Sequence, residues 1–147
     1  GMMGSLGADD VVVALISGGG SALLAAPRDG VPLEEKVGIA RFLAARGAPI
    51  TEINTVRQAA SDVKGGRLAR ECSAGRMLVL VLSDVIGDPL DAIASGPCMP
   101  VEVDANQALD VLERYGAIKA GIAPRLISIL RADAAGPRPP SLRTIHG

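Results

Sequence analysis

Aromatic residues are almost absent from this chain of 147 residues, which contains Phe42, Tyr115 and no tryptophan. Its core must therefore be aliphatic, and a hydrophobic content of 48% supplies enough material for one. An excess of charge of either sign is also missing, because 15 basic residues stand against 16 acidic ones. Nucleic-acid binding usually needs a basic excess and aromatic side chains on which bases stack. The composition therefore predicts a protein that does not bind nucleic acid.

Histidine and cysteine are equally scarce. Because His146 is the only histidine, a nucleophilic serine or cysteine would have no imidazole base, and a histidine-rich metal site is excluded. Cys72 and Cys98 are too few for a disulfide scaffold and do not have the spacing of metal ligands. We expect both to be reduced thiols in a cytoplasmic protein.

Long apolar runs are missing as well, since none approaches the roughly 20 residues that span a bilayer, and no signal peptide is evident. We therefore expect no association with membranes. The length suits one domain. We expect residues 1–10 to be the remnant of a tag and an N-terminal arm, residues 11–131 to form the domain, and residues 132–147 to be a proline-rich tail.

Two unbroken runs of β-favouring apolar residues predict strands at 11–16 and 77–82. Neither run alternates polar with apolar residues, so both strands are expected to be buried on two faces, like the central strands of a parallel sheet. Strands alternating with helices predict an α/β fold with right-handed crossovers. Helical patterns occur at 32–48, 50–63, 65–72, 104–117 and 122–132.

The first helical pattern has the clearest ends. Pro32 is expected in its first turn together with the acidic Glu34 and Glu35, and Arg46 followed by Gly47 is expected to end it. These residues suit the helix dipole and the caps at each end.

Two buried strands need neighbours, and the sequence offers few. Residues 143–147 are a weak candidate for a further strand. Otherwise the neighbouring strands come from outside this chain, because an unpaired strand edge readily pairs with another chain. The pattern therefore predicts a partial α/β domain, or one that completes its sheet by association as a homodimer through exposed sheet edges.

Three glycines between two serines follow the first strand directly, at Ser17, Gly18, Gly19, Gly20 and Ser21. Ligands bind at the carboxyl ends of strands in open α/β sheets, and glycines there let backbone N–H groups face an anion. The run is neither a Walker A loop nor a dinucleotide fingerprint. It is either an anion-binding loop or a tight turn without a ligand.

Two further sets of polar residues are candidates, one around a pair of glycines and one after the second predicted strand. Arg57, Lys64 and Arg67 surround Gly65 and Gly66, a pattern that can hold a phosphate or can be a solvated helix face followed by a helix stop.

Carboxylates follow the second strand. Asp84, Asp88 and Asp91 can supply oxygen ligands to Mg²⁺, or can cap a helix and form a turn. Ser95 and Gly96, with the following proline, can form a second small anion-facing turn. A glycine loop, cations and carboxylates gathered at one edge of a sheet are the components of phosphoryl transfer, which requires no histidine.

Three segments in this order resemble the class II glycerate 2-kinase family, which has also been labelled hydroxypyruvate reductase. They are LISGGGSALL at 15–24, VKGGRLA at 63–69 and LVLSDVIGDPLDAIASGP at 80–97, and the resemblance covers about residues 10–115. It implies a Rossmann-like α/β domain with a mostly parallel sheet and flanking helices. It also implies ATP-dependent phosphorylation of D-glycerate to 2-phosphoglycerate with Mg²⁺, so that the partners are a small organic acid and a nucleotide.

On this basis the candidate site residues fall into three groups. Lys64 and Arg57 are the catalytic candidates, and Asp84 and Asp88 are the candidates for metal binding. The candidates for phosphate or substrate binding are Ser17, Gly18, Gly19, Gly20, Ser21, Gly65, Gly66, Ser95 and Gly96.

The chain also departs from the family pattern. Gln58 and Ala59 stand where the family has lysine and histidine, and Cys98 begins a run that differs from the family's Thr-x-Pro-Asp. Family members are longer and carry catalytic residues on both sides of this region. The expectation is therefore a glycerate 2-kinase-like chain that lacks part of the active site. The alternatives are a non-catalytic phosphate-binding, nucleotide-binding or dimerising remnant, and a hydroxypyruvate reductase.

Overall fold

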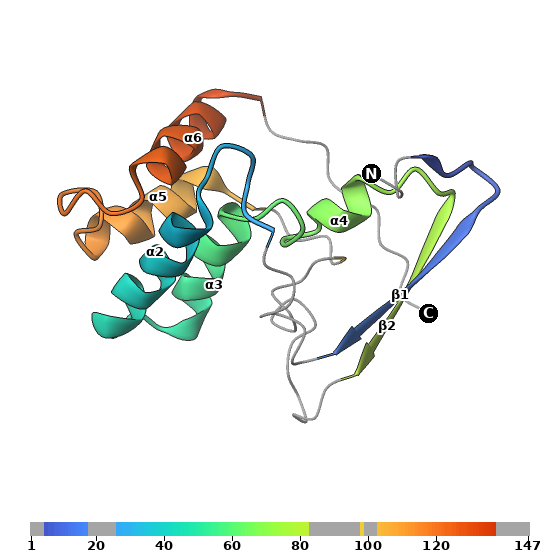
Figure 1. Ribbon diagram of the computed structural model, residues 1–147, viewed down its shortest axis with the longest axis horizontal. Coiled ribbons are helices and arrows are strands. Elements are labelled where there is room, and N and C mark those ends of the chain that lie inside the picture. The colour runs from blue at the N-terminus through green and yellow to red at the C-terminus, as the bar shows by residue number, and fades with distance from the viewer. Residues whose placement is uncertain (1–4, 18–25, 83–97, 99–102, 138–147) are drawn as a thin grey trace. The chain divides into compact units, whose positions relative to one another are not determined.

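The computed structural model describes residues 5–17, 26–82, 98 and 103–137, and the chain divides into two compact units (Figure 1). One, which we call the sheet unit, comprises residues 1–24, 63–102 and 141–147. The other, which we call the helical unit, comprises residues 25–62 and 103–140. Each unit is therefore assembled from separate stretches of the chain.

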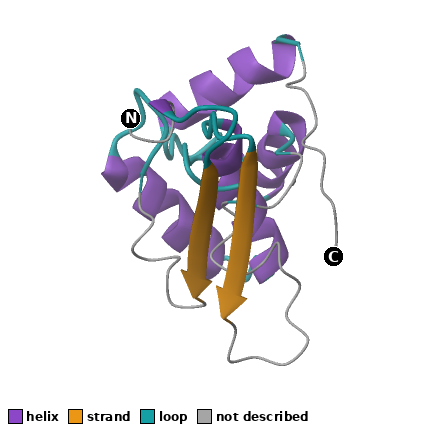
Figure 2. Ribbon diagram, turned by 90° about the vertical axis from the view of Figure 1, so that its right-hand side faces the viewer, coloured by secondary structure: helices purple, strands orange, loops and turns teal. Residues whose placement is uncertain are grey.

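The sheet unit contains β1 (Val11–Ser17), α4 (Arg67–Arg70) and β2 (Arg76–Leu82). The two strands are parallel and paired over their whole length (Figure 2). Both predicted strands are confirmed, each with one more residue than the sequence pattern indicated. The helix predicted at 65–72 is present as the single turn α4.

The expectation that both strands are buried on two faces is wrong for this chain. Exposed residues alternate with half-buried ones along both strands. The described part of the sheet unit offers two strands and one short helix, which is too little to cover both faces of a sheet. The predicted strand at 143–147 lies outside the described residues. The exposed aliphatic side chains of the two strands are Val11, Val13, Leu15, Leu78, Leu80 and Leu82.

The helical unit consists of four described helices, each packed on two others. Helix α2 (Leu33–Ala45) packs on α3 (Ile50–Ala59) and α6 (Pro124–Ala135), and α5 (Ala105–Arg114) packs on the same two helices. The buried core is aliphatic, as the composition predicts, and Phe42 and Tyr115 pack at its margin. Its fully buried side chains include Ile39, Leu43, Val56, Leu112, Leu126 and Leu130.

Glycine ends α2 as predicted. Gly47 has a φ of +75°, which favours glycine, and its N–H donates to the carbonyl of Ala44 at 3.0 Å. The N–H of Ala48 donates to the carbonyl of Leu43 at 3.1 Å, which completes a Schellman motif. The same arrangement ends α5 at Gly116.

Among the helix boundaries that differ from the sequence prediction, two have a clear cause. Pro32 precedes α2 as its cap in extended conformation, so the helix begins at Leu33 and not at the proline. Helix α3 ends at Ala59, four residues earlier than predicted, because Ser61 instead pairs with Pro27 in an antiparallel bridge. Helix periodicity alone does not reveal this competing backbone pairing.

Polar side chains join helices that are distant in the sequence. The carboxylate of Glu35 in α2 accepts hydrogen bonds from the N–H groups of Arg125 and Leu126 in α6, at 3.1 and 3.2 Å. Arg114 of α5 pairs with Glu52 of α3. These contacts fix the helices against one another at their polar margins.

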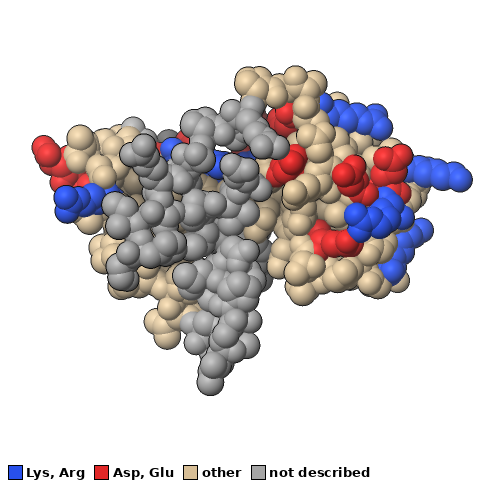
Figure 3. Space-filling view, turned by 180° about the vertical axis from the view of Figure 1, so that it is seen from behind, with Lys and Arg blue, Asp and Glu red and all other residues tan. Residues whose placement is uncertain are grey.

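Acidic and basic side chains are interspersed over the helical unit on the face shown in Figure 3. This distribution fits the near-neutral composition of the chain. Among the described helices, none has the length and apolar character needed to cross a membrane.

Candidate functional site

The carboxyl ends of β1 and β2 lie side by side. Ser17 and Leu82, their last residues, are partners in the sheet register (Figure 2). The segments 18–25 and 83–97 therefore both begin at the same end of the sheet, which we call its carboxyl edge. Both segments carry candidate residues that lie outside the described part of the chain, so their roles stay predictions: Gly18, Gly19, Gly20, Ser21, Asp84, Asp88, Asp91, Ser95 and Gly96.

The turn before α4 places Lys64, Gly65 and Gly66 in buried positions. Gly65 and Gly66 have φ angles of +61° and +72°, a left-handed conformation that favours glycine. The N–H of Arg67 donates to the carbonyl of Lys64 at 3.3 Å and closes the turn. Only 1% of Lys64 is exposed, so the alternative of a solvated helix face does not hold for this lysine.

Arg57 belongs to a different unit from Lys64. It lies in the last turn of α3 in the helical unit and is half-buried, whereas Lys64 lies in the sheet unit. A joint site of the two catalytic candidates therefore stays a prediction.

Lys36 is a buried cation that the sequence analysis did not single out. Its ammonium donates to the carbonyl of Ala26 at 3.1 Å and to the hydroxyl of Ser61 at 3.3 Å. The Ser61 hydroxyl in turn donates to the same carbonyl at 2.8 Å. The backbone N–H of Asp62 also donates to Ala26. We call this group of contacts the Lys36 junction. It joins α2 to the chain at Ala26 and to the chain at Ser61 and Asp62.

The sequence did contain a signal for Lys36. It shares the buried face of α2 with Ile39 and Leu43, at the spacing of three and seven residues that marks one side of a helix. A lysine on such an apolar stripe has lost much of its hydration. Desolvation lowers the pKa of Lys36 most, the positive charge of Arg57 lowers it further, and the negative charge of Asp62 acts in the opposite direction.

The two cysteines are free thiols, as expected, with Cys98 buried and Cys72 half-buried. Burial raises the pKa of Cys98, and its electrostatic interaction with Cys72 raises it further. Within the described ranges, no group of three or more histidine, cysteine or acidic side chains could hold a metal ion. Asp84 and Asp88 lie outside those ranges, so the magnesium site stays a prediction.

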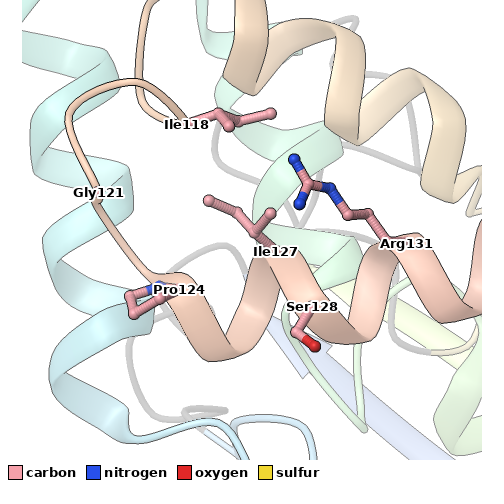
Figure 4. Close-up of a pocket in the computed structure, with 6 residues that line it drawn as sticks. All are labelled: Ile118, Gly121, Pro124, Ile127, Ser128 and Arg131. Carbon is pink, nitrogen blue, oxygen red and sulfur yellow. The ribbon is translucent and has the colours of Figure 1, made fainter.

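A pocket of about 260 Å³ opens beside α6 in the helical unit (Figure 4). Its side chains are mainly apolar, and Ile127 and Arg131 extend toward Ile118. It contains none of the candidate residues from the sequence. The remaining lining residues are Gly121, Pro124 and Ser128.

The family model described as "Domain of unknown function (DUF4147)" matches residues 1–131. The chain belongs to the DUF4147 family. Its relatives carry the name that the sequence motifs indicated. Human glycerate kinase is 48% identical over 130 residues, which are 88% of this chain and 25% of that protein. The D-glycerate 2-kinase of Thermotoga maritima is 49% identical over 115 residues, 78% of this chain and 28% of that protein. The resemblance to the glycerate kinase family is thereby confirmed.

Two solved structures match the fold of this DUF4147 chain. Glycerate kinase from Thermotoga maritima has a TM-score of 0.76 and 44% identity, over 86% of this chain and 31% of that one. A protein from Pyrococcus horikoshii has a TM-score of 0.83 and 38% identity, over 91% and 30%. The α/β class is therefore confirmed as part of the glycerate kinase structure. The DUF4147 chain spans only about a quarter to a third of the length of these relatives.

Proposed function

We propose that this DUF4147 chain is glycerate 2-kinase-like and binds Mg²⁺–ATP and a small organic acid at the carboxyl edge of its parallel sheet. The observation that carries the proposal is the pairing of Ser17 with Leu82. It starts the glycine-serine segment and the aspartate segment at neighbouring points of one sheet edge. Ligands of open α/β sheets bind at such an edge.

The reaction class follows from the components. The γ-phosphoryl group of ATP would pass to the 2-hydroxyl oxygen of D-glycerate, and ADP would leave. Catalysis of this step consists mostly of positioning and of charge neutralisation. Backbone N–H groups of residues 18–20 would hold phosphate oxygens, and Lys64 would neutralise charge. Asp84 and Asp88 would hold Mg²⁺, which neutralises phosphate charge when bound.

The test is isothermal titration with ATP and Mg²⁺ on the wild-type chain and on Lys64→Met. We expect the wild type to bind and Lys64→Met to bind roughly tenfold more weakly or worse, because a charge-assisted contact to phosphate is lost. Lys119→Met, which removes an exposed lysine, is the matched control and should bind like the wild type. Thermal melting of each variant shows whether it is folded. Absence of both heat and a melting shift in the wild type would contradict the proposal.

A hydroxypyruvate reductase is the second candidate. It is supported by a relative from Agrobacterium vitis that is named "Putative hydroxypyruvate reductase" and is 45% identical over 115 residues, 78% of this chain and 30% of that protein. The sequence lacks the dinucleotide fingerprint, because Leu23 stands at the third glycine position. NADH-dependent turnover of hydroxypyruvate would favour this candidate over the kinase.

A non-catalytic protein that binds phosphate or dimerises is the third candidate. The observation that favours it is the sheet, in which each described strand is paired on one side by the other described strand. Exposed edges of this kind pair with other chains. The partner we propose is a second copy of this chain, joined through the sheet edges.

A further inference from the structure

The Lys36 junction contains a buried positive charge that is not neutralised by an ion pair among the described residues. Only 8% of Lys36 is exposed. Its ammonium has three N–H donors, and the carbonyl of Ala26 and the hydroxyl of Ser61 accept two of them. Both acceptors are neutral. Burying an ammonium is costly unless the charge is compensated, so this arrangement suits the binding of an anion.

A second positive charge lies nearby. Desolvation is the largest cause that lowers the pKa of Lys36, and the positive charge of Arg57 in α3 lowers this pKa further. Among the described residues, Asp62 is the one acidic group that acts on Lys36, and it raises the pKa. Arg57 and Lys36 come from two packed helices, and the Ser61 hydroxyl lies just beyond the end of α3. Two cations from neighbouring helices form a set that can bind a carboxylate or a phosphate. The Ser61 hydroxyl donates its one proton to Ala26 and accepts from Lys36, so it positions the ammonium.

The junction adjoins the proposed ligand-binding segments along the chain. Ala26 is the first described residue after the glycine-serine segment 18–25, and Ser61 precedes Lys64 by three residues. The bridge between Pro27 and Ser61 holds these two parts of the chain together. The amine of Lys36 therefore contacts the chain directly where the described structure resumes after the glycine-serine segment.

We propose that Lys36 and Arg57 form an oxyanion-binding subsite that takes the carboxylate or phosphate group of a small ligand, with the Ser61 hydroxyl holding the Lys36 ammonium in place. This subsite lies in the helical unit. It rests on the proposed function only in the class of ligand, since it would take an anionic group of the kind that the ligands named there carry. The third N–H of Lys36 would donate to the anion. A bound anion would add to the negative charge of Asp62 and raise the pKa of Lys36.

The first measurement uses the wild-type chain with ¹³C-labelled lysine. The Cε resonance of Lys36 is titrated with pH alone, with inorganic phosphate and with D-glycerate, and Lys119 serves as the exposed internal control. We expect one anion to raise the pKa of Lys36 and to leave that of Lys119 unchanged. A response to D-glycerate alone identifies a carboxylate subsite, and a response to phosphate alone identifies a phosphate subsite. An unchanged Lys36 with both anions overturns the proposal.

The second measurement compares anion affinity in variants. Lys36→Met should weaken binding of the responding anion roughly tenfold, Ser61→Ala should weaken it less, and Lys119→Met should leave it unchanged. If Lys36→Met does not fold, Ser61→Ala and the wild-type titration decide. Mg²⁺–ATP binding by the wild type with no response at Lys36 would overturn the subsite alone. A response at Lys36 in a chain that does not bind Mg²⁺–ATP would instead contradict the proposed function and retain the subsite.

Discussion

Gly75, directly before β2, occupies a position that has no room for a side chain. A Cβ atom built there would lie 1.8 Å from the carbonyl oxygen of Ala8, which is far closer than van der Waals contact. The obstacle is backbone and cannot rotate away. Gly38 provides the opposite case, because it lies inside α2 and a Cβ atom there would have no heavy atom within 4 Å.

The two glycines should respond oppositely to the same substitution. Gly38→Ala should raise the free energy of unfolding by about 0.5–1 kcal/mol, since glycine is a poor helix former. Gly75→Ala should lower it by about 1–3 kcal/mol, because the backbone must move to make room. Urea unfolding of both variants and the wild type measures the difference. Equal effects of the two substitutions would show that the approach of Ala8 to Gly75 is not present in solution.

Sequence reasoning was sound for some single residues and could not reach others. The role of Gly47 could be predicted because a helix end is encoded locally, by the residues on either side. The role of Gly75 could not, because its constraint comes from Ala8, far away in the sequence. Lys36 lies between these cases. Helical spacing marked its face as buried, but the neighbours at Ala26 and Ser61 come from tertiary structure.

At the scale of helices, α6 begins without a cap of its own. Its cap position is Ala123, which has no side-chain oxygen and has a φ of +52°. Pro124 follows and lacks an N–H, so the first two N–H groups that need acceptors belong to Arg125 and Leu126. The carboxylate of Glu35 accepts from both. A residue of α2 therefore caps α6 and also places negative charge at its positive end.

Loss of this cap should destabilise the helical unit. Glu35→Ala is expected to lower the free energy of unfolding by about 1–2 kcal/mol, the usual cost of losing a charged helix cap. Glu34→Ala is the matched control, since Glu34 is an exposed acid in the same first turn of α2 and should cost less than about 0.5 kcal/mol. Chemical unfolding followed by circular dichroism gives both values. A cost for Glu34→Ala as large as that for Glu35→Ala would assign the effect to α2 itself.

The order and type of the elements could be predicted from the sequence, whereas the burial of the strands could not. Unbroken aliphatic runs at 11–16 and 77–82 indicate strands made for two covered faces. Whether the two faces of the sheet are covered depends on how many helices and strands of the chain pack on them. The residue pattern within one strand does not reveal that number. Val13 and Leu80 are consequently more than 45% exposed in the structure.

The sheet also yields a prediction for the whole molecule. If a second copy pairs with the sheet edges, the mass measured by light scattering should rise toward that of a dimer with concentration. Val13→Lys with Leu80→Lys should shift the equilibrium to monomer, because charges on a strand oppose edge-to-edge pairing. Ile50→Lys, at an exposed aliphatic residue of the helical unit, is the control. A monomer at every concentration in the wild type would exclude the dimer.

The candidate site could be predicted only as far as its components. The register of β1 and β2 supports one shared edge, because parallel strands in register end together. The assignments of residues 18–21, 84 and 88 remain predictions from motif resemblance. The division of Arg57 and Lys64 between two units could not be anticipated, since both lie in one short stretch of sequence.

The interleaving of the two units has a genetic consequence. The chain changes unit after residues 24, 62, 102 and 140, so no contiguous stretch of codons encodes either unit alone. An uninterrupted piece of the gene that encodes the whole helical unit, residues 25–140, therefore also encodes residues 63–102 of the sheet unit.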